Sequence, residues 1–324
     1  MGEPISVSAP VSGTGKSISF ETGLLAQQSQ GAVVGRIGDT VVLATANASV
    51  SSPEGIDFFP LTVDVEERMY AAGKIPGSFF RREGRPTESA ILTARLIDRP
   101  LRPSFAEGYR NETQVVITVL GADQVNPHDI IAINAASAAL MVSGIPFEGP
   151  IGAVRVAYSR EGAWVPHPSY AEGDDSTFEL VVAGRALPDG DVAIMMVEAG
   201  GSEQAWSYYS EGAPKVTEEV IAEGLEAAKA WIKESVELQI RLKAEAGSRP
   251  PLAYLPKKDY GADVLERVEA LGSDRIAKVT TISLKAEREA AMAETTTSLL
   301  EELAGELPGR EKEIANAVRS LTKR

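Results

Sequence analysis

Apolar and polar residues alternate in short runs along the first part of the chain. The runs 17–21, 31–37 and 40–46 are rich in β-branched residues, and turns that contain glycine separate them. This pattern is typical of strands joined by tight turns. A further strand is predicted in 57–65, with Pro60 near its start or at a sheet edge, because proline cannot donate a hydrogen bond to a neighbouring strand.

Helical spacing appears after this strand-rich part. Apolar side chains recur at helical intervals in 87–99, and Pro100 is expected to end this helix. The run 129–143 is apolar almost throughout and is followed by Gly144, so it is predicted to be a buried helix. Further strands are predicted at 114–120, 151–159, 178–183 and 192–198. Residues 1–213 are therefore expected to form an α+β domain in which mixed β-sheets pack with helices.

Near Pro214 the pattern changes to helices alone. One side of 216–246 is apolar at helical spacing, and similar patterns begin at 263 and 282 and run through 310–324. A small all-helical domain is therefore predicted for residues 214–324. No glycine or proline follows the last helical pattern, so we expect the sequence to be part of a longer protein.

The composition is that of a soluble globular protein, with 44% hydrophobic and 24% charged residues. The absence of cysteine excludes disulfides, thiolate metal sites and cysteine nucleophiles, and it suits a reducing cytoplasm. The first ten residues lack the basic and apolar segments of a signal peptide. The apolar stretch 130–147 contains Asn134, Ser137 and Ser143 and is predicted to be a core helix rather than a membrane span. A cytoplasmic location without membrane contact is expected.

Charge is distributed unevenly along the chain. The net charge is −14, which argues against RNA binding over the whole surface, because phosphate contacts need Lys and Arg. The window 68–110, however, holds nine basic and four acidic residues, a local charge of +5 that leaves −19 for the rest. A basic segment in an acidic protein indicates a local anion-binding site.

The most unusual part of this window is 73–86, which is rich in glycine and proline. It contains two adjacent aromatic residues and three arginines, namely Phe79, Phe80, Arg81, Arg82 and Arg85. Aromatic side chains that stack on bases, next to cations that bind phosphates, hold single-stranded nucleic acid without sequence preference. The alternative is that one phenylalanine packs on the core while the arginines are solvated. The residues alone do not decide between the two.

A second cluster of cations lies at the end of the predicted helix 87–99. Arg95, Arg99 and Arg102 follow one another at helical spacing. They could bind an anion such as phosphate. The alternative is a network in which these arginines pair with Asp98 and stabilise the helix end.

Two other features are given structural roles. Residues 12–17 imitate a phosphate-binding loop, but Pro10 stands where that motif needs glycine, and a strand follows where it needs a helix, so a hairpin turn is predicted. His128 and His167 are the only histidines, and neither lies at the spacing of a catalytic triad or a metal site.

Four stretches resemble the first catalytic-core repeat of bacterial polynucleotide phosphorylases. They are 20–26, 79–103, 136–153 and 182–184. The resemblance continues into the helical region and covers essentially the whole chain. It implies the N-terminal half of such an enzyme, an RNase PH-like core followed by a helical linker domain, with Phe79–Arg82 and Arg85 contacting RNA.

The resemblance also implies an activity and its partners. Members of this family are homotrimeric rings with two RNase PH-like cores in each subunit, followed by KH and OB-fold domains. They degrade single-stranded RNA from its 3′ end, with inorganic phosphate as the co-substrate and Mg²⁺ as the cofactor, and release nucleoside diphosphates. Other RNA-degradation proteins are expected partners.

The departures from the family pattern concern the chemistry. The catalytic second core of the family has a serine-rich phosphate-binding turn, and it has a lysine two residues after an acid. Here the matching places are Asn126-Pro127-His128-Asp129 and Glu179-Leu180-Val181, so an aspartate faces the phosphate position and valine replaces lysine. No catalytic residue is therefore predicted in this core, Mg²⁺ is expected in the second core, and the chain alone is expected to be nearly inactive.

Two other functions stay open at this point. The chain could act alone as an RNA-binding protein. Alternatively, the first core could bind a guanine nucleotide and transfer pyrophosphate to it, with Arg95, Arg99 and Arg102 as the anion site.

Overall fold

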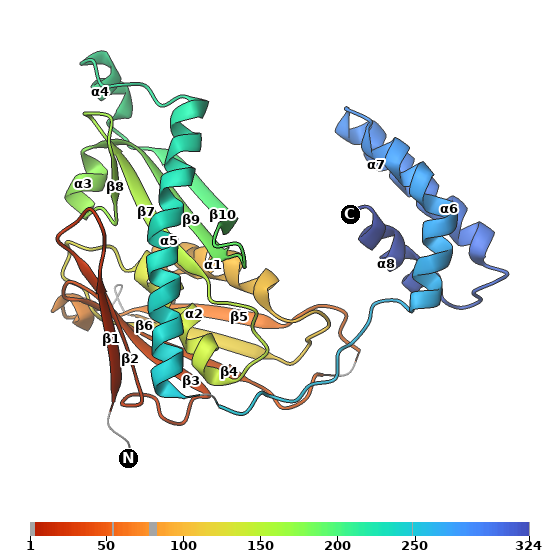
Figure 1. Cartoon of the computed structure of the whole chain (residues 1–324), viewed down its shortest axis with the longest axis horizontal. Coiled ribbons are helices and arrows are strands. Elements are labelled where there is room, and N and C mark those ends of the chain that lie inside the picture. Colours follow the sequence, from red (N-terminus) through yellow and green to blue (C-terminus); the bar gives the residue numbers. More distant parts are fainter. Residues whose placement is uncertain (1–3, 54, 78–82, 248, 324) are drawn as a thin grey trace. The chain divides into compact units, whose positions relative to one another are not determined.

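The computed structural model of the chain describes residues 4–53, 55–77, 83–247 and 249–323. They fall into two compact units, Met1–Tyr254 and Leu255–Arg324. The first unit contains two β-sheets with helices packed on them, and the second contains helices, as Figure 1 shows. The α+β class predicted from the sequence is confirmed.

A six-stranded sheet forms the first layer of the first unit, with the strand order β1-β2-β3-β4-β6-β5. Its strands are β1 (Ile5–Pro10), β2 (Ser17–Thr22), β3 (Gly31–Ile37), β4 (Thr40–Ala48), β5 (Leu61–Glu67) and β6 (Thr113–Gly121). Neighbouring strands are antiparallel except β5 and β6, which are parallel. Pro60 directly precedes β5, which agrees with its predicted place near a strand start.

A four-stranded antiparallel sheet forms the second layer, with the order β10-β9-β7-β8. Its strands are β7 (Gly152–Ser159), β8 (Trp164–Pro166), β9 (Ser176–Ala186) and β10 (Val192–Gly201). The central strands β7 and β9 are buried along most of their length, so they read as continuous apolar runs rather than as alternating ones.

Helix α2 (Asp129–Ser143) packs against β3, β4 and β7 and is buried on every side. Its polar residues connect it to the second sheet. The Asn134 side chain accepts from Ala153 N at 2.8 Å and donates to Ala153 O at 3.0 Å, and Ser137 Oγ accepts from Ile151 N at 2.8 Å. These residues, which interrupt the apolar run in the sequence, therefore satisfy buried backbone groups of the neighbouring strand.

Helix α1 (Glu88–Leu101) begins at the N-cap Thr87, whose Oγ1 accepts a hydrogen bond from Ala90 N at 3.0 Å. The prediction that Pro100 ends this helix is wrong, because Pro100 lies inside its last turn. The helical hydrogen bonding continues past the proline, because Arg102 N donates to Asp98 O.

Several short elements were not predicted from the sequence. They are β1, β8, the 3-10 helices η1 (Met69–Ala72) and η2 (Arg102–Ser104), and the helices α3 (Tyr170–Asp174) and α4 (Ala205–Ser210). β1 does alternate, in Ile5-Ser6-Val7-Ser8, and pairs with the next strand, so the sequence prediction missed a signal that is present. The other five elements are too short to show a helical or alternating period.

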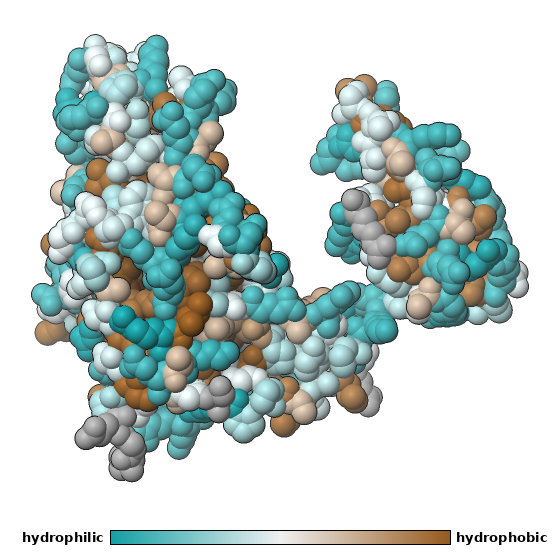
Figure 2. Space-filling view, in the orientation of Figure 1, coloured by the Kyte–Doolittle hydropathy of each residue, from teal (hydrophilic) through white to brown (hydrophobic). Residues whose placement is uncertain are grey.

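Helix α5 (Glu218–Ala246) belongs to the first unit, because it packs along β7, β9 and β1. The sequence predicted a domain boundary between residues 213 and 214, whereas the structure divides the chain after Tyr254. Buried apolar residues of α5, including Ile232 and Val236, complete the core of the second sheet, and this explains the difference. Figure 2 shows hydrophobic residues around the lower half of α5 on an otherwise largely hydrophilic face.

The second unit contains α6 (Ala262–Thr280), α7 (Lys285–Leu303) and α8 (Glu311–Leu321). Their apolar faces meet in one core that includes Val268, Leu299 and Ile314. The helical patterns predicted for this part of the sequence are confirmed. Within the described residues, no helix has the length and apolar character needed to cross a membrane.

Candidate functional site

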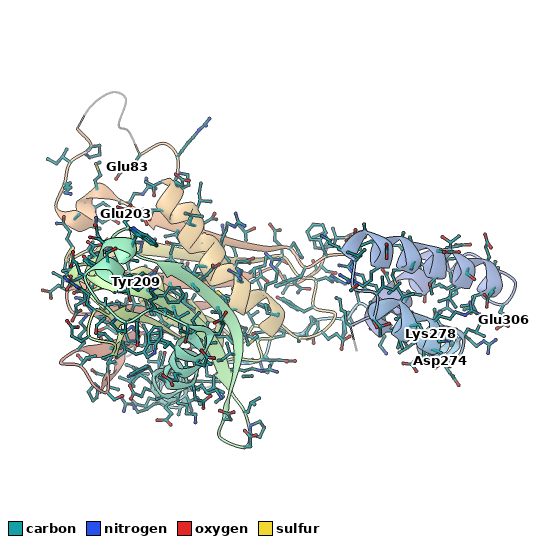
Figure 3. The ribbon with its side chains drawn as sticks, turned by 90° about the horizontal axis from the view of Figure 1, so that it is seen from above. Glu83, Glu203, Tyr209, Asp274, Lys278 and Glu306 are labelled. Atoms are coloured by element: carbon teal, nitrogen blue, oxygen red, sulfur yellow. The ribbon has the colours of Figure 1, made fainter. Side chains whose placement is uncertain are left out.

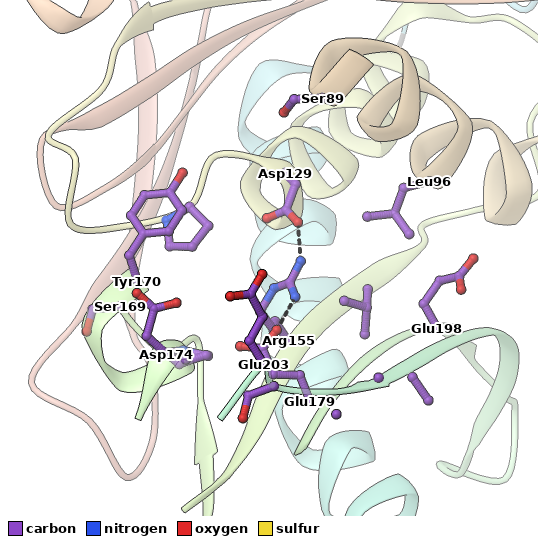
Figure 4. Close-up of a pocket in the computed structure, with 18 of the residues that line it drawn as sticks. Ser89, Leu96, Asp129, Arg155, Ser169, Tyr170, Asp174, Glu179, Glu198 and Glu203 are labelled. Atoms are coloured by element: carbon purple, nitrogen blue, oxygen red, sulfur yellow. Dashed lines mark hydrogen bonds and ion pairs between the residues drawn. The ribbon is translucent and has the colours of Figure 1, made fainter. Parts of the chain in front are cut away.

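A pocket of about 780 Å³ opens between the two layers of the first unit. Its walls are the first half of α1, the start of α2, strand β7, helix α3, and the ends of β9 and β10 (Figure 4). Asp129 and Val181 line it, the positions at which the sequence departs from the catalytic pattern, and so does Glu179, where the acid of that pattern is kept. This pocket is therefore the candidate functional site.

Arg155 on β7 connects the two acidic residues. Its Nη2 lies 2.5 Å from Asp129 Oδ2 and its Nη1 lies 2.6 Å from Glu179 Oε2, as the dashed lines in Figure 4 show. All three side chains are largely buried, with exposed fractions of 22% for Arg155, 14% for Asp129 and 26% for Glu179. Burial opposes the charge of Arg155, but the two carboxylates outweigh it and raise the pKa of the guanidinium.

Asp129 is placed where an anion would otherwise bind. It is the first residue of α2, and its Oδ1 accepts a hydrogen bond from Ile130 N at 2.8 Å. Backbone N–H groups and the helix dipole favour negative charge at a helix N-terminus. The carboxylate of Asp129 therefore occupies both the N-terminus of α2 and the nearest cation, Arg155, so neither is available to a bound anion.

The remaining charges in the pocket are mostly negative. Asp174, Glu198 and Glu203 line it in addition to the bridged pair. Burial, followed by the charges of Asp129 and Glu67, raises the pKa of the Tyr170 phenol at the pocket wall. The pocket is thus anionic, which disfavours phosphate and nucleotide groups.

A magnesium ion does not fit these residues well either. Among the described residues, no group of three or more His, Asp or Glu side chains could hold a metal ion. In the pocket, Arg155 occupies one oxygen each of Asp129 and Glu179 and places a positive charge between them. The expectation that Mg²⁺ belongs to a second core stays a prediction.

The turn before α2 is fixed by Asp123. Its carboxylate accepts from Val125 N at 2.8 Å and from Asn126 N at 2.7 Å, and it also binds Thr40 Oγ1 at 3.0 Å. Burial of Asp123 opposes its charge, but the hydrogen bonds, those from Asn126 foremost, lower its pKa to about 2. The turn Asn126–Asp129 is therefore held in place by an aspartate and not by serine hydroxyls.

His128, given a structural or surface role from the sequence, borders the pocket and binds a carboxylate. Its Nε2 lies 2.9 Å from Glu67 Oε1, and Ser89 Oγ donates to the same oxygen at 3.1 Å. Ser89 and His128 thus both bind the Glu67 carboxylate and are not hydrogen-bonded to each other. A catalytic triad needs the histidine between the acid and the serine, so this arrangement cannot activate Ser89 as a nucleophile. No local pattern could predict this group, because Glu67 and His128 are 61 residues apart.

The predicted anion site at Arg95, Arg99 and Arg102 does not form a single cluster. Arg99 pairs with Glu198 on β10. Arg102 pairs with Asp98 through two hydrogen bonds, of 3.0 and 2.8 Å. It also donates to the carbonyl groups of residues 59 and 61, both at 3.1 Å. Arg95 is exposed in a groove that also contains Asp98. Two of the three cations are thus used inside the fold, which favours the alternative of a network that stabilises the helix end.

The predicted RNA-contacting residues Phe79, Phe80, Arg81 and Arg82 lie outside the described residues. Arg85, the fifth member of that group, is described and is exposed. The RNA-contacting role of this group stays a prediction.

The loop that imitates a phosphate-binding motif is a turn between β1 and β2, as predicted. Thr14 N donates to Val11 O at 3.2 Å, and Val11 N donates to Lys16 O at 2.9 Å. Lys16 Nζ donates to His167 O at 2.5 Å. The lysine of the motif therefore binds a backbone carbonyl within the protein.

His167 is expected to make the protein less stable in mild acid. It is 7% exposed, and burial, followed by the charge of Lys16, lowers its pKa to about 4. The folded form thus keeps the imidazole neutral, and the unfolded chain binds a proton below about pH 6.5. Stability is complete above pH 6.5 and falls towards pH 4, by about 2 kcal/mol between pH 7 and pH 5.

Urea denaturation at pH 7 and pH 5 measures this loss. His167 has φ +46°, which asparagine adopts more readily than most residues, so His167→Asn is the control that removes the titrating group. The variant is expected to lose much less stability over the same interval. An equal loss in both proteins would show that His167 is not the cause.

Comparisons with known proteins agree with this fold. Residues 14–146 match the family model described as "3' exoribonuclease family, domain 1". The crystal structure of rice (Oryza sativa) Rrp46 shares the fold with a TM-score of 0.53 and 17% sequence identity, covering 69% of this chain and 93% of that chain. The first unit therefore has the fold of the RNase PH class of 3′ exoribonucleases.

Curated relatives define the family more closely. The polyribonucleotide nucleotidyltransferase of Acidothermus cellulolyticus is 54% identical over 309 residues, which is 95% of this chain and 39% of the relative. That of Salinispora tropica is 54% identical over 306 residues, covering 94% and 39%. That of Streptomyces coelicolor is 52% identical over 309 residues, covering 95% and 42%. Over nearly its whole length the chain is thus homologous to polyribonucleotide nucleotidyltransferases, and it spans about two fifths of the length of these relatives.

Proposed function

We propose that the chain is the RNA-guiding N-terminal half of a phosphate-dependent 3′→5′ exoribonuclease. In this reaction inorganic phosphate attacks the 3′-terminal linkage of single-stranded RNA and releases a nucleoside diphosphate. The names of the relatives support this class of activity. The phosphorolytic chemistry, with its Mg²⁺, belongs to a second core in the part of the relatives that the chain does not match.

The Asp129–Arg155–Glu179 bridge is the observation that supports assigning RNA guidance to this half and the chemistry to a second core. Phosphoryl transfer needs cations and hydrogen-bond donors that are free to bind the phosphate and the charge that develops on it. In this pocket the guanidinium is bound to two carboxylates, and Val181 stands where a lysine would be needed. The first core is therefore a binding and assembly module in our proposal.

RNA guidance is assigned to the basic segment that contains Phe79–Arg82 and Arg85. The local charge of +5 in 68–110 attracts phosphates, whereas the anionic pocket repels them. Adjacent phenylalanines would supply stacking surfaces for bases. The full-length protein is proposed to form a cytoplasmic homotrimer, in which this half supports the ring and RNA-degradation proteins bind.

Titration with single-stranded RNA tests the guiding role. Phe79→Ala/Phe80→Ala is expected to weaken RNA binding by at least about 30-fold, because each of the two lost stacks is worth about 1–3 kcal/mol. Arg81→Ala/Arg82→Ala is expected to lower the slope of log K against log[salt] by about 1.4, since each lost phosphate contact removes about 0.7. Fluorescence anisotropy of labelled poly(A) at several salt concentrations measures both effects.

A charge-matched control separates a local site from general attraction. Arg319→Ala/Lys323→Ala removes two exposed cations from the second unit and should leave affinity and salt slope unchanged. Retained affinity in Phe79→Ala/Phe80→Ala would contradict the proposed RNA site. A parallel titration with GTP should show no binding, and saturable GTP binding would favour the guanine-nucleotide alternative.

A further inference from the structure

Glu67 is the last residue of β5 and binds the start of α1, so it contacts both ends of residues 68–86, the part of the basic segment that contains Phe79–Arg82 and Arg85. Residues 68–86 leave the sheet after Glu67 and enter α1 at its N-cap, Thr87. Thr87 Oγ1 donates to Glu67 Oε2 at 2.6 Å, and Ser89 Oγ donates to Glu67 Oε1 at 3.1 Å. One carboxylate thus joins the two ends of the segment, 20 residues apart in sequence.

The same carboxylate is also bound by His128, through the oxygen that Ser89 contacts. The Nε2–Oε1 distance is 2.9 Å, and the side chains of His128 and Glu67 are only 16% and 21% exposed. The hydrogen bond from His128, with smaller contributions from Thr87 and Ser89, lowers the pKa of Glu67 to about 2 against the effect of burial. Glu67 is therefore ionised throughout the neutral range and connects β5, the start of α1 and the residue before α2.

A second contact brings the described parts of the segment together. Glu83, labelled in Figure 3, accepts from Met69 N through Oε1 at 2.5 Å. Arg68 Nη1 donates to Glu83 O at 3.3 Å and lies 3.9 Å from Glu83 Oε2. The 3-10 helix η1 begins at Met69. It is fixed to the sheet by a hydrogen bond from Ala122 N, just after β6, to Ala71 O at 2.8 Å. Both ends of the segment are thus connected to the sheet and to each other.

We propose that Glu67 is a positioning residue for RNA binding by the basic segment. It does not contact RNA, because its oxygens are directed at Thr87, Ser89 and His128 and its charge would repel phosphate. It fixes the ends of residues 68–86 so that less conformational freedom is lost when RNA binds. The inference rests on the proposed RNA-guiding function and adds a residue that no base-stacking or phosphate-binding pattern would identify.

The direct test is RNA titration of Glu67→Ala in the full chain. Affinity for labelled poly(A) is expected to fall about tenfold, while the salt slope and the number of binding sites stay at their wild-type values. An unchanged slope means that no phosphate contact is lost. A role in stability alone would lower the fraction of active protein, and hence the apparent number of sites, and would leave the affinity of the folded molecules unchanged.

Glu302→Ala is the matched control. Glu302 accepts from Ser298 Oγ at 2.9 Å and pairs with Arg275 at 2.6 Å, so its loss removes the same charge and a similar set of hydrogen bonds in the second unit. It should not weaken RNA binding. If Glu67→Ala does not fold, Ser89→Ala/His128→Ala removes two of the three donors and keeps the N-cap, and an approximately threefold loss of affinity is expected.

The outcomes distinguish this inference from the function on which it rests. If Phe79→Ala/Phe80→Ala loses RNA binding while Glu67→Ala and Ser89→Ala/His128→Ala bind as wild type, the positioning role is wrong and the RNA site stands. If the phenylalanine variant also binds as wild type, the proposed RNA site fails as well. A lowered salt slope in Glu67→Ala would also overturn the positioning role.

Discussion

Arg155→Met is expected to destabilise the first unit by about 2–4 kcal/mol. The substitution removes the cation between Asp129 and Glu179, and two largely buried carboxylates then lie close together without a positive charge between them. Breaking a buried ion pair by removing one member costs about 3–5 kcal/mol, and the partial exposure of these side chains reduces that figure. Urea denaturation followed by tryptophan fluorescence measures the loss. It reports on the first unit, because Trp164, Trp206 and Trp231 all lie in it.

Arg160→Met is the matched control for this prediction. Arg160 also bridges two carboxylates, Asp175 at 3.4 Å and Glu211 at 2.8 Å, but these partners are 66% and 55% exposed. Exposed ion pairs contribute about 0–1 kcal/mol, so this variant should lose little stability. A loss in Arg155→Met no larger than that in Arg160→Met would show that the buried bridge does not support the fold.

Most of the regular elements could be predicted from residue patterns, because they are long enough to show a period. The strands β2 to β7, β9 and β10 and the helices α1, α2 and α5 follow from alternation, apolar runs and helical spacing. The three-residue strand β8 could not be predicted, since its place is set by pairing with β7. The unit to which α5 belongs was also not predictable, because an amphipathic helix does not specify the surface that its apolar side covers.

Only part of the candidate site could be predicted from the sequence. Asp129 and Glu179 were identified by resemblance to a catalytic pattern, but Arg155 was not, because it lies 26 and 24 residues from them and has no motif of its own. Helical spacing correctly brought Arg95 and Arg99 onto one helix, yet it could not show that Arg99 pairs with Glu198. Ion pairs between separate elements depend on tertiary structure, which a local pattern does not contain.

Phosphorolysis by the chain alone is expected to be at least about 1,000-fold slower than by a complete enzyme of the family. The pocket presents carboxylates at the N-terminus of α2 and keeps Arg155 bound to them, so a phosphate ion would meet repulsion instead of a free cation. Loss of a single stabilising donor at a reacting oxyanion typically costs 100- to 1,000-fold in rate, and here both the lysine and the serine hydroxyls of the family pattern are missing. The same reasoning predicts no measurable binding of inorganic phosphate at millimolar concentration.

Release of ADP from poly(A), in the presence of phosphate and Mg²⁺, measures whether the first core carries out phosphorolysis. The purified chain and the complete polyribonucleotide nucleotidyltransferase of Streptomyces coelicolor are compared at equal molar concentration, with RNA binding of both measured in the same buffer. The chain is expected to bind poly(A) but to release ADP at least about 1,000-fold more slowly. Release within tenfold of the complete enzyme would contradict it, because the first core would then carry out the chemistry itself.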